Sequence, residues 1–148
     1  KATLLPSYLD LIHKITITNI IYEEILKKDS FENLVIKKEV GRGRIKVQPI
    51  DEKLYLNVLK QFKLDEGEAS TFALCVNKGY KIILTDDKEL IKLCKIENVK
   101  FISAMAIAVI LFKKKVISKS ETLEKIEKLQ SYGRYSNDVY NYFKNMVR

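Results

Sequence analysis

Short runs of aliphatic and β-branched residues alternate along this chain with longer stretches whose apolar residues recur at helical spacing. The alternation predicts strands at 15–18, 44–48, 80–85 and 99–103, and helices at 4–14, 19–28, 51–62, 65–79, 87–96, 104–114, 120–132 and 136–146. Strands that alternate with helices pair in parallel. We therefore expect an α/β fold with a central parallel sheet covered on both faces, and a functional site beyond the carboxyl ends of its strands.

The 148 residues predict a single domain, because no Gly-, Pro- or Ser-rich linker divides them. The longest apolar run, 104–112, is far shorter than the roughly 20 residues that span a bilayer, so no membrane association is expected. No secretory leader is recognisable, and we expect a cytoplasmic protein whose Cys75 and Cys94 are free thiols. The single histidine, His13, argues against zinc sites and most histidine-dependent hydrolases.

A net charge of +8 favours binding to phosphate backbones. Residues 37–46 hold one acid, Glu39, and five cations that are candidate nucleic-acid contacts: Lys37, Lys38, Arg42, Arg44 and Lys46. A solvated face in a lysine-rich chain is the alternative. A dinucleotide site is disfavoured, since the only glycine-rich stretch, 41–44, lacks the third glycine and the strand-then-helix context.

Carboxylates stand at or just beyond the C-terminal end of a predicted strand in three places. Glu24 has Ile20 and Ile21 at i−4 and i−3, which predicts that it faces the buried side of its helix, although a surface pair with Lys28 is the alternative. Glu68 precedes an apolar stripe, but its spacing from Asp65 also fits a helix-capping box.

The third place is the pair Asp86 and Asp87 at the end of the predicted strand 80–85. Asp86 with Glu89 fits a second capping box, which leaves Asp87 for chemistry. Carboxylates at one sheet edge, with histidine almost absent, suggest oxygen ligands for Mg²⁺ or Mn²⁺. Such an ion can activate water for phosphodiester cleavage.

Three segments in order, 17–25, 64–71 and 83–87, resemble the conserved motifs of the PIN-domain family (PilT N-terminus). The resemblance implies a three-layer α/β/α fold and places acidic site residues at Glu24, Glu68 and Asp87, with Asp86 as an auxiliary ligand. Segment 99–117 is similar to the family's strand and apolar helix, followed by the Lys-Val-Ile sequence that ends the helix. Segment 129–136 resembles the final helical hairpin of one largely uncharacterised branch, so we expect 118–148 to form such a hairpin within the same domain.

Family members bind Mg²⁺ or Mn²⁺ and cut RNA, and many are toxins of VapBC-type toxin–antitoxin pairs. The resemblance therefore implies a metal-dependent endoribonuclease with RNA as its partner, and extends to an antitoxin peptide and a homodimer. The alternative is a PIN-fold protein whose catalytic site is degenerate and which acts as an RNA-binding or regulatory protein.

The chain departs from the family at its start. The family's first acid is an aspartate at the end of an N-terminal strand, whereas this chain opens Lys1-Ala2-Thr3-Leu4-Leu5. Asp10 is the nearest acid, but it falls in a predicted helix. We expect that a first strand is missing ahead of Lys1, because losing a central strand would expose two neighbouring edges. The alternative is that Lys1 replaces the aspartate.

Overall fold

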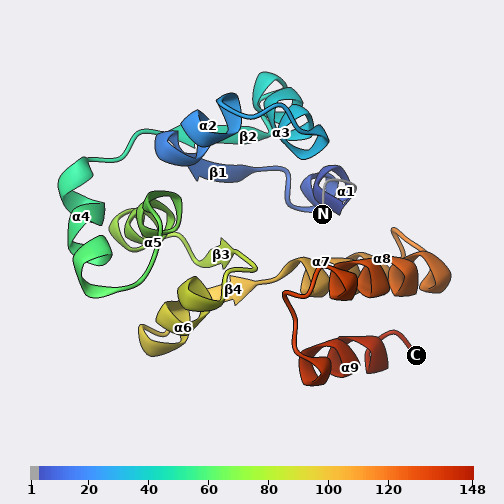
Figure 1. The fold of residues 1–148 in the computed structure, drawn as a ribbon. Helices are drawn as coiled ribbons and strands as arrows, with labels where there is room; N and C mark the ends of the chain where they lie inside the picture. The colour runs from blue at the N-terminus through green and yellow to red at the C-terminus, as the bar shows by residue number, and fades with distance from the viewer. Residues whose placement is uncertain (1–3) are drawn as a thin grey trace.

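The computed structural model describes residues 4–148 and shows short strands linked by helices (Figure 1). The elements in chain order are α1 (Leu4–Ile12), β1 (Ile15–Thr18), α2 (Asn19–Leu26), α3 (Phe31–Gly41), β2 (Ile45–Gln48), α4 (Glu52–Gln61), α5 (Glu66–Lys78), β3 (Ile82–Leu84), α6 (Lys88–Ile96), β4 (Lys100–Ile102), α7 (Ala104–Lys113), α8 (Lys119–Ser131) and α9 (Asn137–Asn145). No helix in this part of the chain is long and apolar enough to cross a membrane.

Most helices begin where the sequence places a capping side chain. The side chains of Thr18, Asp51, Asp65 and Ser136 each accept a hydrogen bond from a backbone N–H in the first turn of the helix that follows. Helix α3 was not predicted, because it has no apolar stripe. Its apolar residues Phe31 and Leu34 are exposed, and its buried residue is the charged Glu39.

The strands pair in parallel, as predicted, but in two sheets. Strand β1 pairs with β2, with Ile15 opposite Ile45, and β3 pairs with β4, with Ile82 opposite Lys100. The mixed α/β class is therefore confirmed, whereas within residues 4–148 the sheet is interrupted between β1 and β3. In Figure 1 these two strands lie on opposite sides of a central opening.

A cavity of about 440 Å³ occupies the space between β1 and β3. Both strands line it along their length, together with side chains of α1 and α5. The Tyr80 hydroxyl reaches across to Thr16 Oγ1 at 3.3 Å. The inner edges of β1 and β3 thus face a shared cavity rather than each other.

The largest apolar core lies around α7, which is buried on nearly all sides against α1 and α8. Ile126 and Leu129 of α8 and Val147 at the C-terminus belong to the same core, so 118–148 packs into it. A second core joins α5, α6 and β3 and contains the buried free thiols Cys75 and Cys94. Burial raises the pKa of both thiols.

Candidate active site

Helix α5 begins in a capping box that involves two of the predicted acids. Asp65 Oδ1 accepts from the Glu68 backbone N–H at 2.8 Å, and Glu68 Oε2 accepts from the Asp65 backbone N–H at 3.2 Å. Glu68 therefore has the capping role that its spacing predicts. It is also half-buried and turned toward other carboxylates, which a cap does not require.

The pKa of Glu68 is raised to about 7, chiefly by burial; the hydrogen bond from the Asp65 backbone lowers it, and the negative charges of Asp65 and Asp87 raise it. A hydrogen bond that protonated Glu68 can donate to Asp87 acts in the same direction. The starts of α5 and α6 thus bring two carboxylates face to face. Such a pair is unfavourable when both are charged, unless a cation lies between them.

Asp87, not Asp86, is the N-cap of α6. Its Oδ1 accepts from the Leu90 backbone N–H at 2.8 Å, so the expected cap by Asp86 with Glu89 is wrong by one residue. The turn after β3 sets this register, because the Thr85 hydroxyl accepts from the Asp87 backbone N–H at 3.0 Å. Asp87 nevertheless faces Glu68.

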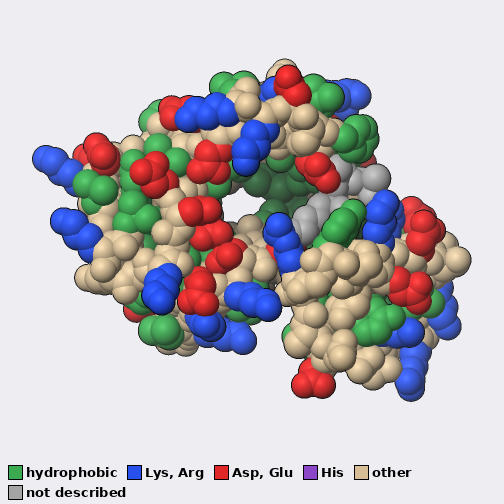
Figure 2. Space-filling model, viewed as in Figure 1, with side chains coloured by type: hydrophobic (Ala, Val, Ile, Leu, Met, Phe, Trp, Pro, Cys, Tyr) green, Lys and Arg blue, Asp and Glu red, His purple; other side chains and the backbone are tan. Residues whose placement is uncertain are grey.

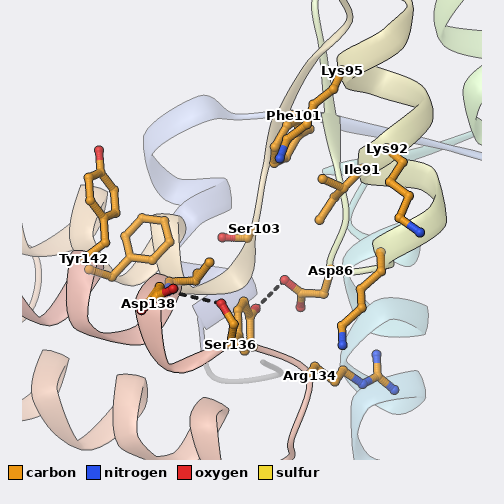
Figure 3. A pocket seen from close by; sticks show the side chains of 14 residues that line it. Asp86, Ile91, Lys92, Lys95, Phe101, Ser103, Arg134, Ser136, Asp138 and Tyr142 are labelled. Atoms are coloured by element: carbon orange, nitrogen blue, oxygen red, sulfur yellow. Dashed lines mark hydrogen bonds between the residues drawn. The ribbon is translucent and has the colours of Figure 1, made fainter.

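Asp86 points the other way and joins distant segments. Its Oδ1 accepts from the Ala104 backbone N–H at 2.9 Å, at the start of α7, and from the Tyr135 hydroxyl between α8 and α9. A dashed line in Figure 3 ends on Asp86 at this bond. Burial, and next the Asp86 carboxylate, raise the pKa of Tyr135. The arrangement ties the C-terminal helices to the end of β3.

We expect Tyr135→Phe to lower the free energy of unfolding by about 2 kcal/mol, because it removes a charge-assisted hydrogen bond, and Asp86→Ala to lower it by more, because it removes that bond and the one from the Ala104 N–H. The two losses should not add, since they share one bond. Urea unfolding of the single and double variants measures the coupling, with Tyr132→Phe, an exposed tyrosine of the same connection, as control. Fully additive losses would contradict the bond.

Glu24 interacts electrostatically with Asp65, the N-cap of α5. The expectation that it faces the buried stripe of its helix is wrong, because its side chain is exposed. Its carboxylate instead lies over the start of α5, where a Cβ added to Gly67 would be 3.3 and 3.4 Å from the two oxygens. Burial against α5, followed by repulsion from Asp65, raises the pKa of Glu24.

A buried contact holds α2 against α5 beneath these acids. The hydroxyls of Thr18, the N-cap of α2, and Ser70 of α5 lie 2.8 Å apart. Figure 2 shows acidic side chains gathered beside the central opening, over α2, α5 and α6. Sequence reasoning assigned Asp65 only to capping. Its negative charge raises the pKa of both Glu24 and Glu68, which makes it part of the acidic cluster Glu24, Asp65, Glu68 and Asp87.

The ligand set is small. Within residues 4–148, no three His, Cys, Asp or Glu side chains converge closely enough to hold a metal ion by themselves. Asp10 does not join the cluster, because it pairs with Arg44. The position predicted for the family's first acid, at Lys1, lies outside the described residues.

The basic segment 37–46 is largely neutralised within the fold. Arg44 pairs with Asp10 and, at 2.5 Å, with the buried carboxylate of Glu39, which Arg42 also contacts at 3.5 Å. The hydrogen bond from Arg44 lowers the pKa of Glu39 more than burial raises it. Lys37 pairs with Asp29 at 3.5 Å. The exposed cations are Lys38, Arg42 and Lys46, and a nucleic-acid role for this segment stays a prediction.

A family model described as a PIN domain matches residues 1–147. The chain has no significant match among curated proteins or among solved structures. PIN domains are generally nucleases, and PIN nucleases generally use divalent metal ions. Because the match covers almost every residue, and the acidic motifs fall at the starts of α5 and α6 and within α2, the chain belongs to the PIN-domain family.

Proposed function

We propose that the protein is a Mg²⁺- or Mn²⁺-dependent endoribonuclease whose site is built around Glu68 and Asp87, with Glu24 at its edge. The observation that carries the proposal is the facing pair of carboxylates at the starts of α5 and α6, where burial and then the neighbouring negative charges raise the pKa of Glu68 to about 7. A carboxylate kept so far from its preferred ionisation is typical of functional sites. A bound cation would remove the unfavourable charge.

The donors fit a hard cation. Mg²⁺ is usually held by one or two carboxylates, and water and substrate phosphate supply the remaining oxygens. Glu68 Oε2 and Asp87 Oδ1 are engaged in helix caps, so each carboxyl group has a second oxygen available to a cation. Two facing carboxylates are sufficient for this mode of binding.

When bound, the ion would stabilise charge on the phosphate and lower the pKa of an attacking water. Glu68 would bind it most tightly once deprotonated, so a proton leaves Oε1 or Oε2 as the cation enters. Asp87 stays in place through its bond to the Leu90 N–H, which orients its second oxygen. Asp65 places a further negative charge beside Glu68, which would strengthen cation binding.

RNA cleavage with and without metal tests the proposed activity. We expect a labelled single-stranded RNA to be cut in Mn²⁺ or Mg²⁺ and to stay intact in excess EDTA. A parallel preparation of Glu68→Gln controls for contaminating nucleases, and DNA of the same sequence tests the choice of RNA. Cleavage that continues in EDTA would contradict a metal-dependent reaction.

A non-catalytic RNA-binding protein is the second candidate. It is favoured by the absence of a three-ligand metal group from the described residues. Calorimetric Mn²⁺ titration separates the two, because the binder needs no metal. The toxin role, the antitoxin peptide and the homodimer are narrower proposals that only the family resemblance supports.

A further inference from the structure

A cavity of about 680 Å³ lies between α6 and α9 (Figure 3). We propose that it binds single-stranded RNA, with phosphates on the α6 side and bases stacked on the aromatic side chains of the α9 side. The proposal rests on the proposed ribonuclease function for the choice of RNA. The volume falls within the ~300–1,000 Å³ typical of ligand sites.

One wall carries a row of cations. Lys88, Lys92 and Lys95 recur at i, i+4 and i+7 along α6, so their side chains follow one face of the helix over about 10 Å. Figure 3 shows Lys92 and Lys95 on this wall and Arg134 at its lower end. Spaced cations along a groove are the usual means of following a phosphate backbone.

Most of this positive charge is not neutralised by the part of the chain that the structure describes. Lys92 pairs with Glu89 at 2.6 Å, but among the described side chains no ion pair involves Lys88, Lys95 or Arg134. The basic segment 37–46 differs, because Arg42 and Arg44 hold Glu39 there. Of the described acids, two line the cavity. Asp86 already accepts two hydrogen bonds from the protein. The other acid in the lining that could pair with these cations is Asp138, at the start of α9.

The opposite wall is aromatic. Tyr142 is 62% exposed although it lines a cavity, and it contacts the Phe143 ring edge-on with centroids 5.2 Å apart. Phe101 of β4 is half-buried in the same cavity. Aromatic rings left open beside unpaired cations suit a nucleobase, which stacks on the ring while its phosphate contacts the cations. An acidic peptide would use the cations but not the ring faces.

The cavity reaches the start of α6, the helix that Asp87 caps. Asp86 and Lys88 line it, and Asp87, which faces Glu68, lies between them in the chain. A strand of RNA that follows Lys95, Lys92 and Lys88 along α6 would therefore reach the carboxylates at the helix start. The cavity thereby supplies the substrate path to the acids.

Binding in EDTA isolates this site from catalysis. The probe is a labelled ten-nucleotide oligouridylate, measured by fluorescence anisotropy over a series of salt concentrations. The Lys88→Ala/Lys95→Ala variant should flatten the slope of log K against log salt by about 1.4, which corresponds to two phosphate contacts on a single strand. Lys53→Ala/Lys60→Ala is the matched control, with two exposed lysines seven residues apart on α4.

Tyr142→Leu keeps an apolar side chain but removes the ring, and should weaken binding at least about fivefold without changing the salt slope. Phe31→Leu, an exposed aromatic residue on α3, should have no effect. Wild-type slope and affinity in both cavity variants, with melting temperatures unchanged, would overturn the proposal. So would displacement of RNA by a polyglutamate peptide that is insensitive to Tyr142→Leu.

The same variants assayed for cleavage in Mn²⁺ keep the two proposals apart. If the wild type binds RNA through this cavity but never cuts it, the RNA site stands and the nuclease proposal fails. If the wild type cuts RNA and the cavity variants bind as it does, the nuclease stands and the RNA site is rejected.

Discussion

Glu68→Gln should lower metal-dependent RNA cleavage by at least about 10²-fold, because it removes one of two facing carboxylates proposed to hold the ion. The same substitution should raise the melting temperature at pH 8. Glutamine retains the acceptor that closes the capping box of α5, so the helix start is preserved. Loss of activity with a gain in stability marks a residue kept for function.

The pH dependence has a definite sign. The pKa of Glu68 is raised to about 7 in the folded protein, whereas its ordinary value is 4.5, so the folded state binds the proton more tightly. Protonation of Glu68 therefore adds to the free energy of unfolding, fully below pH 4.5, and this contribution is lost as the pH rises through 7. The glutamine side chain of the variant never ionises, so the two melting temperatures should converge near pH 4.5 and separate by pH 8.

The control is Glu52→Gln, an exposed acid in the first turn of α4, which should alter neither cleavage nor the pH profile. Asp87→Asn should reduce cleavage as strongly as Glu68→Gln and should also raise the melting temperature at pH 8, since asparagine is an equally good N-cap and no longer repels Glu68. If Glu68→Gln cleaves normally, Glu68 is not a ligand. If cleavage falls but stability at pH 8 does not rise, the charged form of Glu68 does not destabilise the fold.

A designed strand joined ahead of Lys1 should tighten Mn²⁺ binding at least about tenfold, provided that it is apolar, β-branched and ends in aspartate, since each added carboxylate strengthens a hard-cation site. The cavity between β1 and β3 is lined by both strand edges and would accept the added strand in parallel. Hydrogen exchange should then slow at the amides of Ile15–Thr18 and Ile82–Leu84, because the new strand would bond to both edges.

The matched control is the same strand ending in asparagine, which should protect the amides equally and leave the affinity for Mn²⁺ unchanged. Equal tightening by both strands would mean that the added carboxylate does not reach the acidic cluster. No protection by either would mean that the cavity is not the seat of a strand. The interruption of the sheet would then be a property of the fold.

Capping side chains were predictable because each acts within four residues of itself, as Asp65 and Glu68 do. Two adjacent acids after β3 both fit a cap, and a contact across 49 residues decides between them, since Tyr135 engages Asp86 and leaves Asp87 to α6. Helix α3 escaped prediction for a related reason. Its buried Glu39 is stabilised by Arg44, which follows the helix.

The pair of carboxylates and the cavity between α6 and α9 also differ in how far the sequence predicts them. The facing of Glu68 and Asp87 could be anticipated, because both follow from motifs at helix starts. The cavity between α6 and α9 could not, because Lys95 and Tyr142 belong to helices that no sequence spacing relates. Side chains that meet only through tertiary packing leave no periodic signal.

The missing side chain of Gly67 lets the carboxylate of Glu24 lie against the start of α5. A methyl group there would lie 2.7 Å from Ile21 Cδ1 and 3.3 and 3.4 Å from the two Glu24 oxygens, so both side chains would have to shift to make room for it. The absence of a Cβ at this position thus sets how near Glu24 comes to the helix that carries Glu68.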